Sequence, residues 1–421
     1  MKYAKQWKLA KDAYNGEGGF LNGDYINKYP RELENKIEQR REIAYYTNIF
    51  ASKVSRFIGY IYKQKPVRDT KSNILKIILD DIDMKKNSAN IFFSNFAKNA
   101  KVYGCNLILI DMPTALPDNL KDQMQQRAFP YTVEIDPQRV LNYKLDNYGN
   151  FEYVFISDTM LNEKGKVVEI KRYYDNAQWV IYDKDDNALD KGEHNLGVTP
   201  VLIFSEDGLF PTTGEFTQIA NLAKRHYNLQ SELDEILRGQ TFSILTMQTS
   251  SSGDIKLSTD NALLYQKDAD RPEFIAPPSA PAEMYRQRIK DIEEQIDTIA
   301  YDITTNKSTE SGIALSIKFQ GLNASLSSFA QRLEDFELRV YEVIAKYLKE
   351  TSDVTVSYAK EFSIVDINQE IAILEQMQGL ISSPTYFKLK AMQIITNDLS
   401  SADNADITKI ESEIEDSLKP Q

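Results

Sequence analysis

The sequence feature that most constrains the fold is a pair of strongly periodic segments within residues 281–350. Their apolar side chains recur at steps of three and four, which keeps them on one face of a helix and is incompatible with a strand. In the first segment these side chains are Tyr285, Ile289, Ile292, Ile296, Ile299 and Ile303. In the second they are Leu315, Phe319, Leu322, Leu326, Phe329, Leu333, Phe336, Val340, Val343 and Tyr347. Burying one such side chain contributes roughly 1.5–3 kcal/mol, so the second helix must lie across a domain or against a neighbouring subunit.

A polar stretch from Thr304 to Gly312, without an apolar side chain, separates the two predicted helices. Thr309 or Ser311 could cap the second helix, and Gly312 adds backbone freedom where the chain must turn. Because the stretch lacks an apolar anchor, we expect it to project from the packed helices. Taken alone, the pair fits a two-helix hairpin of a coiled-coil or bundle protein.

Composition excludes several classes of protein. The 421 residues suffice for two or three packed units, and no run of about 18 apolar residues could span a membrane. The single cysteine, Cys105, precludes an intrachain disulfide, fits a reducing compartment and, beside an apolar strand, is expected to be a buried structural thiol. The net charge is −12 without a basic stripe, which argues against a protein that grips nucleic acid but allows a conduit past which DNA slides.

The remaining pattern predicts an α+β fold. The first 25 residues are polar, with a flexible loop at 16–19. A long helix is expected at 31–63, and shorter helices at 73–82 and 87–102. Strands are expected at 107–110 and then, as an antiparallel meander, near 131–136, 139–145, 150–157, 166–174, 178–183 and 200–205. A helix follows Gly214, then a small insert with strands at 262–265 and 274–275. After the central helices come a strand at 354–358 and helices at 368–380, 385–398 and 405–418.

No motif for chemistry emerges. The two histidines, His194 and His226, fit no metal-ligand spacing and are expected to be structural. There is no phosphate-binding glycine loop and no nucleophile elbow. Acidic pairs such as Glu293-Glu294 fit solvated helix faces. The sequence therefore predicts a protein that is not an enzyme, with no catalytic residue, no metal ligand and no cofactor.

Four stretches, in this order, carry a resemblance to a known family. They are 25–32 (YINKYPRE) running into 40–48 (RREIAYYTN), 194–201 (HNLGVTPV), 311–315 (SGIAL) before the long apolar helix, and 379–385 (GLISSPT). Together with the order of predicted helices and strands, they resemble the portal proteins of tailed double-stranded DNA bacteriophages, along nearly the whole chain.

The resemblance implies a portal-type division of the chain, with long helices packed on an antiparallel sheet. Residues 1–213 would form the N-terminal wing, 214–249 and 281–303 the stem helices, and 250–280 a small β clip. Residues 304–312 would be the tunnel loop, 313–365 the long wing helix with a returning strand, and 366–421 a helical crown.

The resemblance also implies a function at one capsid vertex. Portals form rings of about twelve subunits, through which the genome is packaged and ejected. Expected partners are further copies of the chain, double-stranded DNA, the terminase large subunit, a head–tail adaptor, and the major capsid and scaffolding proteins. No membrane partner is expected. The protein would reside in the virion, and in the host cytoplasm during assembly.

Two groups of residues are predicted to serve that function. The loop would offer neutral donors and one cation to DNA phosphates, from Thr304, Thr305, Asn306, Lys307, Ser308 and Thr309. The subunit-packing stripe would be Leu315, Phe319, Leu322, Leu326, Phe329, Leu333, Phe336 and Val340. Two alternatives stay open: another ring or adaptor protein of a phage head, or a metal-dependent nucleic-acid enzyme using carboxylates such as Asp291 and Glu294.

Overall fold

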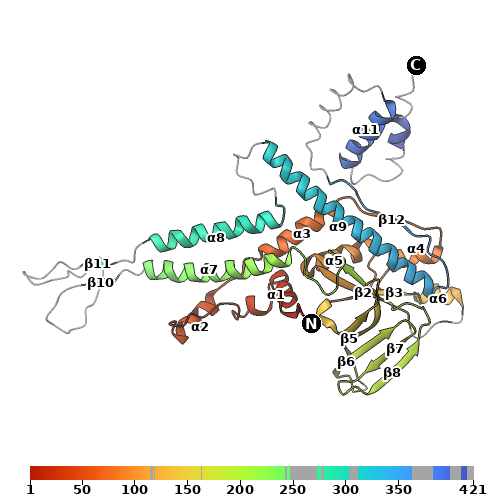
Figure 1. The fold of residues 1–421 in the computed structure, drawn as a ribbon, viewed down its shortest axis with the longest axis horizontal. Coiled ribbons are helices and arrows are strands. Elements are labelled where there is room, and N and C mark those ends of the chain that lie inside the picture. The colour runs from red at the N-terminus through yellow and green to blue at the C-terminus, as the bar shows by residue number, and fades with distance from the viewer. Residues whose placement is uncertain are drawn as a thin grey trace, which may run out of the picture. The chain divides into compact units, whose positions relative to one another are not determined.

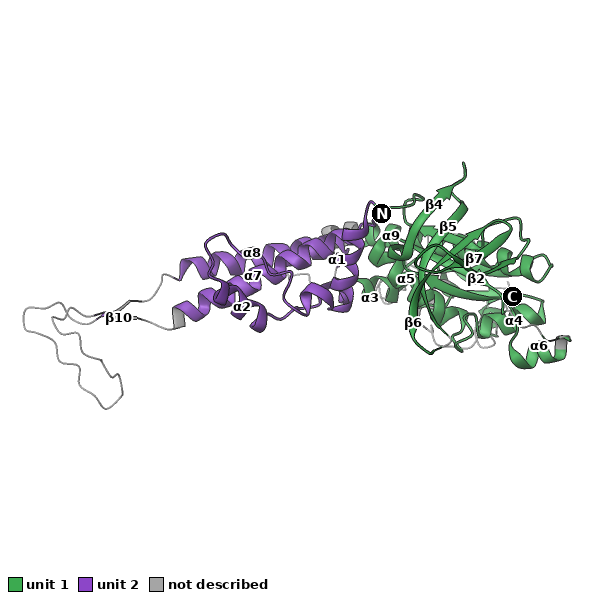
Figure 2. Ribbon diagram, turned by 90° about the horizontal axis from the view of Figure 1, so that it is seen from below, with its two compact units in different colours: residues 1, 54–212, 303–421 green, residues 2–53, 213–302 purple. Residues whose placement is uncertain are grey.

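The computed structural model describes residues 1–113, 117, 119–162, 164–241, 244–246, 273–275, 279–302, 312–362, 383–398 and 409–414. The fold is α+β, as predicted. The chain divides into two compact units (Figure 2). Unit 1 comprises residues 1, 54–212 and 303–421, and unit 2 comprises 2–53 and 213–302. The region predicted as one N-terminal wing, 1–213, is therefore shared between the units.

A five-stranded antiparallel meander forms one part of unit 1 (Figure 1). Its strands are β4 (Val140–Leu145), β5 (Phe151–Leu161), β6 (Val167–Asp175), β7 (Gln178–Tyr182) and β8 (Ala188–Glu193). Three of its turns have one design, in which an Asp or Asn at 146, 162 or 183 accepts hydrogen bonds from backbone N–H groups two and four residues later. Gly, Asn and Asp, which favour turns, occupy these connections between the predicted strands. The edge strand β8 was missed because its six residues, ALDKGE, are mostly polar and exposed.

A separate three-stranded sheet holds the most apolar strand of the chain. In the order β3-β2-β9, β2 (Cys105–Asp111) lies between β3 (Tyr131–Ile135) and β9 (Val201–Ser205), antiparallel to both. The sequence placed β9 and β3 in a six-stranded meander, whereas they pair with β2. Burial on both faces explains the unbroken apolar run of β2.

Helices cover this small sheet. Unit 1 contains α4 (Asn73–Asp80), α5 (Ala89–Tyr103), α6 (Leu120–Gln126) and the long α9 (Gly312–Tyr347). α5 ends at Gly104, whose φ of 85° is one that glycine adopts without strain, and the chain then enters β2 directly. α9 packs against β2, β9 and β12 (Thr355–Ser357), and β12 pairs with β1 (Val67–Asp69) from the other end of the chain. The tail contributes α11 (Pro384–Asp398), close to its predicted bounds.

Unit 2 is built on a helical pair. α7 (Thr217–Thr241) and α8 (Ala280–Ile299) lie side by side, and the strands β10 (Ile244–Thr246) and β11 (Glu273–Ile275) pair between them in the chain (Figure 1). The sequence extended the first of these helices to residue 249, but it ends at Thr241. Beyond it, Ile244 and Thr246, both β-branched, belong to the ladder with β11.

The N-terminal part of unit 2 differs most from the sequence prediction. Residues 1–25, for which the sequence predicted polar character and a loop at 16–19 but no helix, contain α1 (Ala4–Asn15), and its Trp7 is fully buried. The helix expected over 31–63 is two helices, α2 (Glu34–Ile43) and α3 (Ile49–Ile61), and residues 54–61 of α3 already belong to unit 1. The break at Ala44–Asn48 is extended at its start, and Asn48 begins α3 by accepting a hydrogen bond from Ala51 N–H at 2.9 Å.

Candidate functional site

The predicted DNA-contacting residues Thr304, Thr305, Asn306, Lys307, Ser308 and Thr309 lie outside the described residues. The same holds for most of the predicted clip and crown. Gly312 is the first residue of α9, so the long helix begins where the polar stretch ends.

The apolar stripe of α9 lies inside unit 1. Leu322, Leu326, Phe329, Leu333, Phe336 and Val340 are each at most 4% exposed, and Phe319 is partly buried. Leu315 belongs to the helix, but its side chain lies outside the described part of the structure. The sequence left two possibilities for these six side chains: burial across a domain, or burial against a neighbouring subunit. The fold of a single chain already buries them. A role of the stripe in subunit packing stays a prediction.

Aromatic rings make the contacts of this stripe. Phe336 stacks on Phe96 of α5 with ring centroids 5.1 Å apart, and Phe204 of β9 contacts Phe336 at 5.6 Å. Phe329 contacts Phe204 at 5.4 Å and Phe57 of α3 at 5.8 Å. The stripe therefore joins α9, α5, α3 and β9 into one core.

A buried ion pair holds α9 to the β1–β12 ladder, and sequence reasoning missed it. Glu337 is 0% exposed and receives two hydrogen bonds from Arg68, at 2.7 Å from Nε and 2.6 Å from Nη2. Tyr358 and Tyr341 also donate to the carboxylate. Burial acts against the charge of Arg68, but the adjacent Glu337 outweighs it and raises the pKa of Arg68 above its usual range. One signal was present: Glu337 is a charged residue on the apolar face of the predicted helix, four residues after Leu333 and three before Val340.

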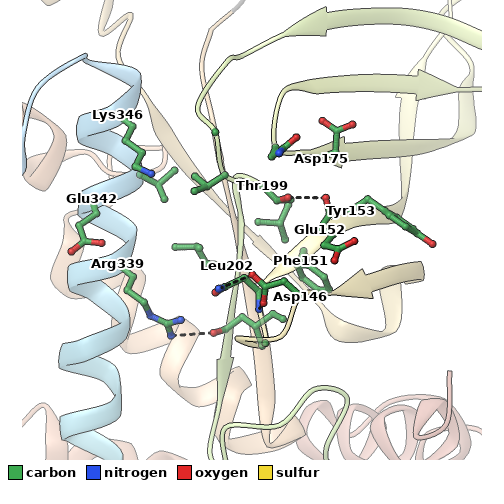
Figure 3. Close-up of a pocket in the computed structure, with 18 of the residues that line it drawn as sticks. Asp146, Phe151, Glu152, Tyr153, Asp175, Thr199, Leu202, Arg339, Glu342 and Lys346 are labelled. Carbon is green, nitrogen blue, oxygen red and sulfur yellow. Dashed lines mark hydrogen bonds between the residues drawn. The ribbon is translucent and has the colours of Figure 1, made fainter.

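A groove of about 600 Å³ lies beside α9 in unit 1 (Figure 3). The β4–β5 turn with the start of β5 forms one wall, β9 lies in the middle, and α9 forms the other wall. From α9, Arg339, Glu342 and Lys346 share one exposed face, since they are three or four residues apart. The residues labelled in Figure 3 are Asp146, Phe151, Glu152, Tyr153, Asp175, Thr199, Leu202, Arg339, Glu342 and Lys346.

An open strand edge runs through this groove. The backbone N–H of Ile110 donates to the Pro200 carbonyl, and that of Glu206 donates to the Gly104 carbonyl. Because hydrogen-bonded pairs alternate along an antiparallel ladder, the backbone groups of Leu202 and Phe204 also bond to β2. Ile203 and its odd-numbered neighbours therefore turn their amide groups to the other edge, where no described strand pairs with β9. There Arg339 Nη2 donates to the Ile203 carbonyl at 3.3 Å.

The groove is acidic. Asp146, Glu152, Asp175 and Glu342 line it against the cations Arg339 and Lys346. The Asn150 and Tyr148 backbone N–H groups donate to Asp146 and lower its pKa. Partial burial acts to raise the pKa of Asp175, but hydrogen bonds from the N–H groups of Ala177 and Gln178, both 2.8 Å, outweigh it, so the pKa is lowered. Both carboxylates therefore carry charge at neutral pH.

The other singled-out polar residues have structural contacts. Cys105 is buried, its thiol lies 3.6 Å from the Thr212 carbonyl, and burial raises its pKa to about 12. His226 is buried in unit 2 with Nε2 3.1 Å from Glu293. His194 lies 3.1 Å from the Asp175 carbonyl, and burial lowers its pKa. These positions agree with the predicted structural roles.

The carboxylates of the nuclease alternative lie on α8. Asp291 and Glu294 line an open hollow on the α7–α8 pair, where Asp291 accepts a hydrogen bond from Gln287 at 2.9 Å and lies 3.8 Å from Arg288. Among the residues that the structure describes, no group of three or more Asp, Glu, His or Cys side chains could hold a metal ion. Within the same residues, no helix is long and apolar enough to cross a membrane.

The fold is that of an α+β protein with a helical pair in unit 2 and, among the described residues, three antiparallel sheets in unit 1. A family model described as "Domain of unknown function (DUF4055)" matches residues 215–348, which run from the start of α7 to the end of α9. No curated protein matches the chain.

The solved structures that are similar to this chain include two from gene transfer agent particles. One is a chain of the neck of an empty gene transfer agent particle computed with C6 symmetry, at 9% identity and a TM-score of 0.45, covering 89% of this chain and 99% of that one. The other belongs to the virion of a native gene transfer agent particle, at 9% identity and a TM-score of 0.42, covering 91% of this chain and 98% of that one. Similarity of this degree carries no functional argument.

Proposed function

We propose that this chain is the subunit of a portal ring in a tailed-phage-like particle. About twelve copies would surround a channel at one capsid vertex, through which double-stranded DNA enters and leaves. The ring would dock the terminase large subunit during packaging and a head–tail adaptor afterwards. Its outer surface would meet the major capsid and scaffolding proteins, so the protein would act in the host cytoplasm during assembly and then in the virion.

One observation carries this proposal: the order of helices and strands from α7 to α9. A 25-residue helix is followed by a short β ladder and by a 20-residue helix that returns beside the first. Nine residues, 303–311, then lead into a helix of 36 residues. This is the order stem, clip, stem, loop and long helix that the resemblance to portal proteins implied.

In this proposal the parts keep their expected roles. α7 and α8 form the stem, the region around β10 and β11 the clip, and 304–312 the tunnel loop. Residues 1–213 with α9 and β12 form the wing, and 366–421 the crown. The groove beside α9 lies in the proposed wing.

The charge of the chain suits a conduit. Protein–DNA affinity grows with the number of phosphates that cations neutralise, and this chain has a net charge of −12. At physiological salt, charges farther apart than about 8 Å are largely screened, so repulsion acts only where DNA passes close to the wall. Such a channel would let DNA slide without holding it.

Imaging of the purified full-length protein by negative-stain electron microscopy, with its mass measured by light scattering, tests the proposal. A closed ring of about twelve subunits with an axial opening supports a portal. A smaller assembly that binds a pre-formed portal would favour an adaptor. A monomer at all concentrations, or metal-dependent cleavage of DNA that Asp291→Asn abolishes, would overturn the proposal.

A further inference from the structure

The β5–β6 hairpin extends beyond the rest of its sheet. β4 pairs with β5 only as far as Ile156, and β7 pairs with β6 only from Lys171 onward. Residues 157–161 and 167–170 therefore pair only with each other, ending at Leu161 opposite Val167. A two-stranded ribbon is at best marginally stable in water, and its unpaired edges invite further strands.

The tip of this hairpin exposes apolar side chains. Leu161 is 65% exposed and Val167 is 68% exposed, and Met160 beside them is also exposed. Lys164 and Lys166 lie in the turn between them, and both are exposed. With Glu163 counted from the sequence, residues 162–166 carry a net charge of +1.

The opposite end of the same ribbon reaches the acidic groove. β5 begins there with Phe151 and Glu152, and the preceding turn exposes 90% of Tyr148 at the mouth of the adjoining hollow. From Phe151 to Leu161 the strand advances about 33 Å. The hairpin tip therefore cannot reach the groove of its own chain.

We propose that the hairpin tip of one copy docks in the groove beside α9 of a second copy. The apolar side chains of the tip would cover the half-buried Leu202 and Ile203, and the backbone of the tip would meet the open edge of β9. Lys164 and Lys166 would face the groove, whose lining includes four carboxylates and only two cationic side chains.

Two unlike surfaces at the two ends of one ribbon make this a head-to-tail contact. Unless two copies exchange tips about a two-fold axis, such a contact continues until the copies form a ring, or else an open chain. The inference rests on the self-association in the proposed function, but not on a channel for DNA.

Cysteine cross-linking in the full-length protein tests the contact. A chain carrying Leu161→Cys and Tyr148→Cys should give a ladder of dimers, trimers and larger products with a short bis-maleimide, because each copy offers both ends. An equimolar mixture of the two single variants should give dimers as its cross-linked product. The native Cys105 is buried and lies at neither surface.

A matched control uses another turn of the same design. Asp185→Cys, in the β7–β8 turn, combined with Tyr148→Cys, should give no ladder. The absence of a ladder from the Leu161→Cys, Tyr148→Cys protein, whether the protein is assembled or monomeric, would overturn the docking. A ladder from open chains without rings would uphold the docking and refute the portal ring. Rings that give no cross-linked ladder would uphold the portal ring and refute the docking.

A second measurement needs no cross-link. Leu161→Asp should weaken self-association roughly tenfold, as expected for an anchor residue at an interface, while Leu189→Asp on the edge strand β8 leaves it unchanged. Lys164→Glu should also weaken it, and more at low salt than at high salt, with Lys184→Glu in the β7–β8 turn as its control. Equal assembly by Leu161→Asp and the native protein would contradict the proposal.

Discussion

At the scale of single residues, Glu337 and Arg68 show how much of unit 1 depends on one buried pair. The Arg68 side chain is 5% exposed and Glu337 is 0% exposed, so neither charge is solvated by water. Their two hydrogen bonds, with those from Tyr358 and Tyr341, replace that solvation. Such a pair stabilises the fold less than its short distances suggest, but removing one partner leaves a buried charge without compensation.

Glu337→Gln should lower the free energy of unfolding by about 3–5 kcal/mol, since Arg68 would stay charged among neutral groups. Urea unfolding followed by circular dichroism measures the change. Glu342→Gln, an exposed position five residues further along α9, is the control and should change stability by no more than about 0.5 kcal/mol. The double variant Arg68→Met, Glu337→Leu should recover most of the loss. A loss in the double variant as large as in Glu337→Gln would contradict this account.

Asp207 gives a pH-dependent prediction. Burial acts to raise its pKa, but hydrogen bonds from the hydroxyl groups of Thr212 at 2.6 Å and Ser205 at 2.7 Å outweigh it, so the pKa is lowered. A lowered folded-state pKa adds stability that is complete above the ordinary Asp value of about 3.9 and is lost as the pH falls through the folded value. Native protein should therefore lose more stability between pH 6 and pH 3 than Asp207→Asn does.

The matched control for this prediction is Asp190→Asn on the exposed strand β8. Urea unfolding at both pH values supplies the comparison. If Asp207→Asn and the native protein have the same pH dependence, the hydrogen bonds of Asp207 do not stabilise the folded state.

At the scale of elements, α9 combines a core-facing stripe with an exposed face that forms one wall of the groove. Phe336 is 0% exposed and stacks on Phe96, whereas Gln331 on the same helix is exposed. Phe336→Ala should cost about 3–5 kcal/mol of stability, because the removed ring leaves a cavity between α9 and α5. Gln331→Ala should cost little. Thermal and urea unfolding of both variants would show the difference, and a small effect of Phe336→Ala would mean that the stripe is not tightly packed.

The sequence predicts two parts of the fold: the helices, from the spacing of their apolar residues, and the hairpin turns, from the residue types that favour turns. α8, α9, α11 and the three similar hairpin turns follow from apolar spacing and from Asn, Asp and Gly at the turns. The pairing of β1 with β12 could not be predicted, since strand partners distant in the chain leave no local signal. The α2–α3 break was missed because the helical pattern continues through Ala44–Asn48. The groove also depends on tertiary pairing, since its walls come from residues 146–153, 173–176, 197–203 and 339–346.

At the scale of the whole molecule, Lys307 is the one cation of the proposed tunnel loop. In a ring it would form a collar of like charges around the channel. Lys307→Glu should leave expression and ring size unchanged but lower the amount of packaged DNA, because carboxylates would repel phosphates at close range, where screening is weakest. DNA content per particle is the measurement.

Lys349→Glu, an exposed position after α9, is the control for that variant. Particles with full-length genomes from the double variant Lys307→Glu, Asn306→Ala would refute the role of the loop and leave the ring itself unaffected.

The discontinuity of unit 1 also sets the order of events during synthesis. Arg68 and Glu337 are 269 residues apart in the chain, and β1 precedes β12 by a similar span. At ribosomal rates of 5–20 residues per second, Arg68 would wait roughly 15–50 s for Glu337 to be made. The nascent body therefore stays incomplete until most of the chain has left the ribosome. Truncated products of interrupted translation would lack α9, and with it the part of the core that its apolar stripe fills and one wall of the groove, so only completed chains would be competent to join an assembly.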